Sequence, residues 1–293
     1  MMNMELMNFT NLPRKKKSYG GANGSKLSVI INGATYMLKL SAHAEKNSSM
    51  SYSNSAVSEY LGSHIFNTVG IETQETILGV YTYKGTDRIA VACKDFTSNG
   101  FILQDFASLK NQIIDSASNG LGTELDDILE AIEKQTFLNQ RTLANHFWNI
   151  FAIDALIGNS NRHNGDWGFL YNEEKDDLKL APIFDCGSCL FPQADENTLK
   201  LCLKDERNFK SRIYDFPTSS IKLNNRRINY YNFINSHAYK GCDEAFMRMK
   251  DKIDLSKINN LIDEIPCITD THKTFLKKIL KARFETFYIK CMK

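Results

Sequence analysis

Alternating apolar and polar positions dominate the first third of the chain and predict a sheet. Lys26–Ile31 and Ala34–Leu40 are β-rich runs, and the Asn32-Gly33 pair between them is a strong hairpin signal. Two further strands are expected around Glu75–Tyr83 and Arg88–Cys93. These four strands predict a small sheet in the first third of the chain.

Apolar residues at helical spacing predict several helices, one of them within this first third. Ser55–Val69 has that spacing, and Gly70 is placed to end the helix. Arg141–Ile157 reads as a strongly apolar, buried helix, and Asp270–Lys293 as an amphipathic one. Thr123 to Asp126 fits a capping box at the start of another helix.

The order of these elements predicts the fold class. Strands come first and helices follow, which indicates an α+β chain with a small β-rich lobe and a larger, mostly helical lobe. We place the boundary after residue 95, so that residues 1–95 form the N-terminal lobe and residues 96–293 the C-terminal lobe.

Composition narrows the class of protein. Of 293 residues, 42% are hydrophobic and 24% are charged, a globular mix, and the formal net charge of +2 gives no reason to expect nucleic acid binding. Seven irregularly spaced cysteines suggest reduced thiols, and no apolar run resembles a signal peptide or a membrane span. We expect a protein that is cytoplasmic as synthesised; export by a dedicated secretion machine stays open.

A glycine-rich stretch precedes the first strand of the hairpin. Its backbone N–H groups could cradle phosphates, although a plain surface loop explains the glycines equally well. The candidate ATP-binding residues in it are Gly20, Gly21, Ala22, Asn23, Gly24, Ser25 and Lys26.

Lys39, near the end of the second hairpin strand, is a candidate phosphate ligand. Glu59 lies 20 residues further on, in the predicted helix, and could orient the lysine ammonium toward nucleotide phosphates. The alternatives are a lysine that extends from a sheet edge into solvent and a glutamate on a solvated helix face.

Two polar segments near the middle of the chain carry the most specific signal. Gly158–Trp167 follows the buried helix, and Leu180–Asp185 follows it after two short strand-like runs, Gly168–Tyr171 and Leu178–Leu180. This arrangement would bring Asp166 and Asp185 together at one end of a hairpin. Carboxylates suit Mg²⁺, which takes few protein ligands beside phosphate oxygens. An Asx-rich turn explains the first segment but not the second.

These two segments resemble those of the HipA-like serine/threonine kinases. Within that group the chain is most similar to the short CtkA-type kinases, and the resemblance extends over most of residues 9–192. It implies a two-lobed kinase fold that binds ATP and Mg²⁺ between the lobes. Lys39 would bind the α/β-phosphates with Glu59 as its partner, and Cys93, Lys94 and Asp95 would form the hinge that meets adenine.

The resemblance also assigns roles in the first segment, Gly158–Trp167, which would be the catalytic loop, with one departure from the family. Asp185 would be a metal ligand, and His163 would support the loop. The family usually has an aspartate base at the position of Asn161 and an asparagine metal ligand at that of Asp166; here the two are exchanged. We therefore expect Asp166 to bind Mg²⁺, and we expect the amide of Asn161 to occupy the position where the family has its base.

The leading interpretation is an ATP- and Mg²⁺-dependent serine/threonine protein kinase that autophosphorylates and modifies a protein acceptor. The CtkA-type resemblance adds an acceptor in a host cell, reached by non-classical export. Two alternatives remain: a phosphoinositide kinase, whose loop is similar, and a nucleotide-binding pseudokinase, which Asn161 supports.

Overall fold

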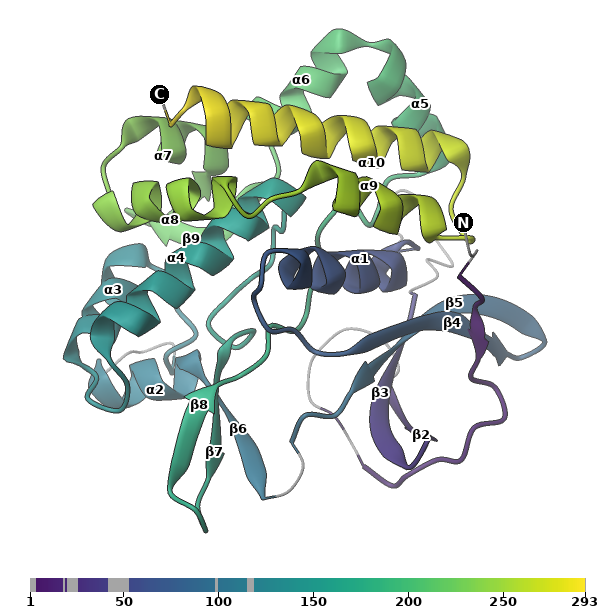
Figure 1. Ribbon diagram of the computed structural model, residues 1–293, viewed down its shortest axis with the longest axis horizontal. Helices are drawn as coiled ribbons and strands as arrows, with labels where there is room; N and C mark the ends of the chain where they lie inside the picture. Colours follow the sequence, from purple (N-terminus) through teal and green to yellow (C-terminus); the bar gives the residue numbers. More distant parts are fainter. Residues whose placement is uncertain are drawn as a thin grey trace.

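The computed structural model describes residues 4–17, 19, 26–41, 53–97, 100–114 and 119–292, and it has the two-lobed α+β architecture (Figure 1). The N-terminal part contains β1 (Met7–Asn8), β2 (Lys26–Ile31), β3 (Ala34–Leu40), α1 (Ser55–Thr68), β4 (Thr76–Tyr83) and β5 (Thr86–Lys94). The rest contains β6 (Phe101–Asp105), α2 (Phe106–Ile113), α3 (Leu125–Lys134), α4 (Gln140–Ile157), β7 (Gly168–Asn172), β8 (Asp177–Leu180), α5 (Glu196–Lys204), α6 (Glu206–Tyr214), β9 (Thr218–Leu223), β10 (Arg226–Asn229), α7 (Tyr230–Ser236), α8 (Lys240–Lys250), α9 (Leu255–Glu264), α10 (Asp270–Arg283) and the π-helix η2 (Phe284–Lys290).

A five-stranded sheet in the order β1-β4-β5-β3-β2 forms the small lobe. The predicted hairpin is confirmed: β2 pairs antiparallel with β3, from Lys26 opposite Lys39 to Ile31 opposite Ala34. Asn32 and Gly33 both have positive φ, as the favoured two-residue hairpin turn requires. The turn thereby fixes the register that places Lys39.

The two faces of this sheet contribute to different hydrophobic cores. One face, with Val29, Leu38 and Ala92, belongs to a small core of its own. The other, with Leu78 and Val91, joins the large core that continues through the helical lobe. Helix α1 lies between the sheet and helices α9 and α10, so it packs against both lobes (Figure 1).

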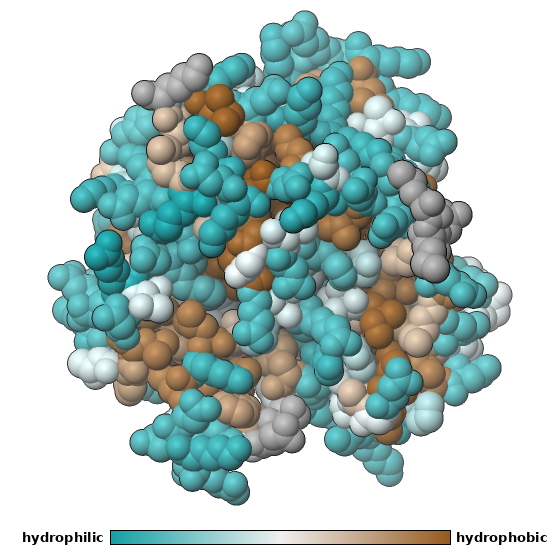
Figure 2. Space-filling model, in the orientation of Figure 1, coloured by the Kyte–Doolittle hydropathy of each residue, from teal (hydrophilic) through white to brown (hydrophobic). Residues whose placement is uncertain are grey.

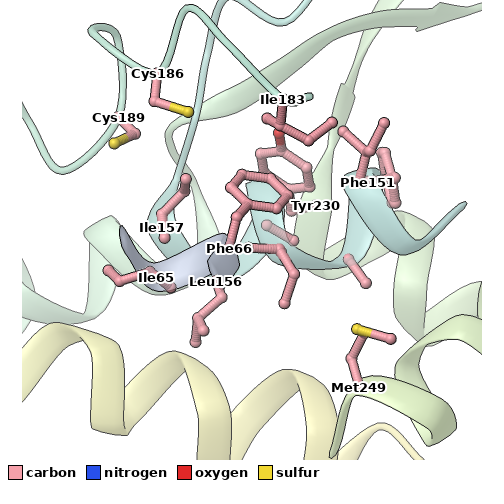
Figure 3. Close-up of a cluster of buried hydrophobic side chains, with 14 of the residues drawn as sticks. Ile65, Phe66, Phe151, Leu156, Ile157, Ile183, Cys186, Cys189, Tyr230 and Met249 are labelled. Carbon is pink, nitrogen blue, oxygen red and sulfur yellow. The ribbon is translucent and has the colours of Figure 1, made fainter. Parts of the chain in front are cut away.

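The large core connects α1 to the loop after β8. Figure 3 shows side chains from α1 (Ile65, Phe66), α4 (Phe151, Leu156, Ile157), the segment after β8 (Ile183, Cys186, Cys189), α7 (Tyr230) and α8 (Met249). Each of these residues is almost fully buried. The boundary after residue 95 stays a prediction, since this core extends across it.

The helices predicted at 55–69 and 141–157 are confirmed within a residue or two by α1 and α4. Helix α4 is capped by Asn139, whose side chain accepts from the Thr142 N–H, and it ends at Gly158 with φ of 64°. The last predicted helix is α10, which continues as η2 rather than as one α-helix.

The capping box expected at Thr123 is wrong. Helix α3 begins after Glu124, which makes no side-chain cap, because the Thr123 hydroxyl donates instead to the Ser220 carbonyl of β9. Strands β6, β9 and β10 were not anticipated either. The tertiary pairing of β9 therefore overrides the local capping pattern.

The outer surface of the described residues is mixed in character. On the face shown in Figure 2, apolar side chains reach the surface in separate patches that polar side chains interrupt. Among the described helices, none is both long and apolar enough to cross a membrane.

Candidate active site

Lys39 contacts two carboxylates that are distant in sequence. Its Nζ lies 2.9 Å from Glu59 Oε2 and 3.0 Å from Asp185 Oδ1, and its side chain is 19% exposed. Burial opposes the charged ammonium, but Glu59 and Asp185 outweigh it and raise the pKa of Lys39 well above its usual value. The lysine is therefore a fixed cation at the junction of the sheet, α1 and the loop after β8.

Glu59 uses both of its oxygens. While Oε2 accepts from Lys39, Oε1 accepts from the Cys186 N–H at 3.1 Å. The carboxylate is 1% exposed, and α1 holds it between both lobes. Glu59 thus connects Lys39 to the peptide that follows Asp185.

Asp185 occupies a left-handed backbone conformation, with φ of 57°. This unusual conformation for a residue other than glycine turns the carboxylate back toward Lys39. The Lys39 ammonium lowers the pKa of Asp185, against the opposing effect of partial burial. Lys26, opposite Lys39 in the hairpin, adds a second positive charge that favours the carboxylate.

Asp166 lies near Asp185 but in a different environment. Its Oδ2 accepts from the His163 N–H at 3.0 Å, and the side chain is 6% exposed. Burial, and then the neighbouring Asp185 carboxylate, raise the pKa of Asp166 to about 6. Carboxylate oxygens are ligands that Mg²⁺ prefers, so Asp166 and Asp185 are the residues here that could hold a divalent cation.

A buried ion pair forms the base of the catalytic loop. Arg162 Nε donates to Asp154 Oδ2 at 3.0 Å, and both side chains are less than 5% exposed. The same guanidinium donates to the carbonyls of Asp166 and Phe184, so it joins the two loops that carry the aspartates. Burial raises the pKa of Asp154, while Arg162 opposes this rise. This pair was not predicted, although Asp154 inside an apolar helix was a visible signal.

Asn161 and His163 lie at the surface of this loop. Asn161 is exposed, and its N–H donates to Asn159 Oδ1 at 3.1 Å. His163 Nδ1 accepts from the Gly165 N–H at 3.1 Å and lies 3.4 Å from Asp166 Oδ2. The exposed side of the loop therefore offers an amide and an imidazole.

The three predicted hinge residues lie at the end of β5. Cys93 is buried and paired with Met37 of β3 on one side and with Thr76 of β4 on the other. Lys94 Nζ reaches Glu75 at 2.7 Å. Contact of this segment with adenine stays a prediction.

Asp95 is held by side chains from the N-terminal segment. Its carboxylate accepts from Lys17, from the Tyr19 hydroxyl at 3.0 Å and from Thr97. Burial opposes ionisation, but the hydrogen bonds from Lys17 and Thr97 outweigh it and lower the pKa of Asp95. The phosphate-loop candidates Gly20, Gly21, Ala22, Asn23, Gly24 and Ser25 lie outside the described residues.

The β9–β10 hairpin supports the catalytic loop from its other side. The Ser220 hydroxyl donates to the Arg162 carbonyl, and the Arg227 guanidinium donates to the Ser160 carbonyl. Just after β10, the buried Tyr230 hydroxyl donates to the Asn159 carbonyl at 2.6 Å. None of these three contacts was predicted, although Asn224-Asn225 is a turn signal.

Known proteins resemble both the sequence and the fold. Residues 17–265 match the family described as the HipA-like C-terminal domain. Serine/threonine-protein kinase CtkA from Helicobacter pylori (strain J99) is 44% identical over 269 residues, which cover 92% of this chain and 82% of that protein.

Two solved structures have a similar architecture. The crystal structure of a Helicobacter pylori proinflammatory kinase CtkA has a TM-score of 0.91 at 41% identity, and the match covers 98% of this chain and 97% of that chain. A toxin–antitoxin complex of HipA, HipB and operator DNA from Shewanella oneidensis MR-1 has a TM-score of 0.54 at 11% identity. That match covers 96% of this chain and 67% of the other chain, and it concerns the fold alone.

Proposed function

The chain belongs to the family of the HipA-like C-terminal domain and is a serine/threonine protein kinase, and from that premise we propose that it transfers the γ-phosphate of ATP, held with Mg²⁺, to a protein hydroxyl. The observation that carries this proposal is the contact of Lys39 with both Glu59 and Asp185. A lysine on a strand, a glutamate on a helix and a metal aspartate are the parts that position phosphates in protein kinases.

The residues present fit both ATP and Mg²⁺. Lys39, with Lys26 opposite it, offers positive charge for phosphate oxygens, and Asp166 and Asp185 offer carboxylates for the metal. When bound, Mg²⁺ would neutralise charge on the phosphates, where phosphoryl transfer obtains most of its catalysis. Cys93, Lys94 and Asp95 remain our proposed hinge.

Within the catalytic loop, we assign the functional role to the carboxylate of Asp166 rather than to the amide of Asn161. Asp166 is buried next to Asp185, whereas Asn161 is an exposed amide, which cannot accept a proton. We assign Asp166 the metal and Asn161 a position beside the acceptor hydroxyl. Phosphoryl transfer depends mainly on positioning and charge neutralisation, so the absence of a base at this position is compatible with activity.

The acceptor includes, in our proposal, serines of the chain itself. Ser18, Ser25 and Ser28 lie in or near the phosphate-loop stretch of the sequence; the first two lie outside the described residues, and Ser28 is buried in β2. Transfer to Ser28 would need β2 to open. The relative from Helicobacter pylori is called proinflammatory, and we extend to this chain the prediction of a host-cell acceptor.

The test is incubation of the purified protein with γ-³²P-labelled ATP and Mg²⁺, beside Lys39→Ala and Asp185→Ala. We expect label on the protein or on a generic protein substrate, and its loss in both variants. Label that survives in both variants would contradict this active site.

The exposed amide of Asn161 favours one second candidate, a pseudokinase that binds nucleotide without turnover. It predicts that ATP with Mg²⁺ raises the melting temperature while no substrate is labelled. Label that appears on phosphoinositide vesicles but on no protein would instead favour a lipid kinase.

A further inference from the structure

The β9–β10 hairpin presents one face to the core and one face outward. Ile221 and Ile228 point inward and are about 5% exposed. Because side chains alternate along a strand, Ser220 and Lys222 lie on the opposite face. Arg227 is the cross-strand partner of Lys222 and therefore shares that outer face.

Two side chains of this outer face contact the catalytic loop. The Ser220 hydroxyl donates to the carbonyl of Arg162, and the Arg227 guanidinium donates to that of Ser160. These two carbonyls flank Asn161, the exposed residue that we place beside the acceptor hydroxyl. The outer face of the hairpin therefore borders the position that we assign to the acceptor segment.

Two positive charges face each other on this surface. Lys222 and Arg227 are directly opposite and exposed, an arrangement that costs stability in a hairpin. Neither forms an ion pair with any residue in the described part of the chain. Arg227 also donates to three backbone carbonyls, those of Ser160, Thr218 and Ser219, while no described residue accepts from Lys222 Nζ. A carboxylate placed here would relieve the repulsion.

We propose that the outer face of β9–β10 docks the protein acceptor and selects a segment with acidic residues beside the serine or threonine that is phosphorylated. This inference rests on the proposed kinase activity and names its substrate class. Lys222 is the specificity-determining residue, and Arg227 has a second role as a clamp on the catalytic loop. The attraction acts across exposed groups, so it should weaken as salt is added.

The experiment compares three peptides that share one serine and differ only in flanking Glu, Gln or Lys residues. For the unaltered protein we expect kcat/KM about tenfold higher for the acidic peptide than for the neutral one at low salt, with a smaller ratio at 0.5 M salt. In Lys222→Glu the order should reverse in favour of the basic peptide. Lys222→Gln should bring the acidic-to-neutral ratio close to one.

Arg226→Glu is the matched control for Lys222→Glu. Arg226 carries the same charge and is adjacent to Arg227, but it pairs with Leu223 and points to the other face of the hairpin. It should keep the acidic preference. Equal rates on all three peptides, or an equal loss of preference in Lys222→Glu and Arg226→Glu, would overturn the docking surface but leave the kinase activity in place. Label on phosphoinositide vesicles alone, with none on any peptide, would overturn both.

Discussion

The catalytic loop and the loop after β8 each carry one of the two site aspartates, Asp166 and Asp185, but the protein holds these loops in different ways. The catalytic loop is fixed inside the large lobe, by the buried Arg162–Asp154 pair and by hydrogen bonds from β9, β10 and Tyr230. The loop after β8 shares the Arg162 contact through the Phe184 carbonyl, but it is also held across the lobes, through Lys39 and through the bond from the Cys186 N–H to Glu59.

We infer that the contacts of the catalytic loop mainly stabilise the fold, whereas the contacts between the lobes mainly assemble the site. A change in the catalytic loop should cost stability, because it leaves buried polar groups without partners. A change in the contacts between the lobes should cost mainly activity, because Lys39 has two carboxylate partners and keeps one of them when the other is altered.

The largest loss of stability should follow Arg162→Met, which leaves Asp154 buried without its cation. We expect the free energy of unfolding to fall by about 3–5 kcal/mol, measured by urea denaturation. The control is Arg248→Met, since Arg248 is one-third exposed, donates to Asn149 and lies 3.9 Å from the exposed Glu244 carboxylate. Equal, small changes in both variants would show that the pair does not anchor the loop.

Glu59→Gln should act on turnover instead. The substitution removes the charge that orients Lys39, so we expect kcat to fall by about 10- to 100-fold. The loss of unfolding free energy should be smaller than in Arg162→Met, because Lys39 keeps Asp185 as its partner. Glu130→Gln removes an exposed partner of Lys134 on α3 and should leave kcat unchanged. A destabilised Glu59→Gln protein with normal kcat would reverse our division between the two loops.

Tyr230→Phe leaves the Asn159 carbonyl without its donor and should cost about 1–2 kcal/mol of stability. Tyr288→Phe is the matched control, because the Tyr288 hydroxyl is equally buried and donates to the Ala152 carbonyl within α4. We expect similar destabilisation in both, measured by thermal unfolding, but a lower kcat only in Tyr230→Phe. If kcat fell equally in both variants, the hydrogen bond from Tyr230 to the catalytic loop would have no specific role in turnover.

The smallest effect concerns acid stability through His272 of α10, far from the site. Burial lowers the pKa of His272 to about 4, while the unfolded side chain titrates near 6.5. The unfolded chain therefore binds the proton first as the pH falls, and stability drops by about 1 kcal/mol between pH 7 and 5.5. His272→Gln should reduce this slope. Parallel slopes for the unaltered protein and the variant would contradict the assignment.

Local sequence signals predicted the framework that carries the site. Asn32-Gly33 specified the turn that sets the register of Lys39, and helical spacing located α1 with Glu59. The contact of Lys39 with Glu59 was predicted and is confirmed at 2.9 Å. These features depend on turn chemistry and periodicity, which a short stretch of sequence contains.

The supports of the catalytic loop could not be predicted in the same way. Ser220 and Arg227 reach carbonyls about 60 residues earlier in the chain, and no local pattern contains such a pairing. Strand β9 pairs with residues near Thr123, which is also why the capping box there did not form. Tertiary contacts decided both cases.

We propose that Asp166, and not Asn161, supplies the essential group of the catalytic loop. The most direct measurement is single-turnover phosphoryl transfer from labelled ATP in Asp166→Ala and Asn161→Ala, with folding of both verified by thermal unfolding. We predict a loss of at least about 100-fold in Asp166→Ala and less than about tenfold in Asn161→Ala. Full activity in Asp166→Ala together with an inactive Asn161→Ala would contradict this assignment.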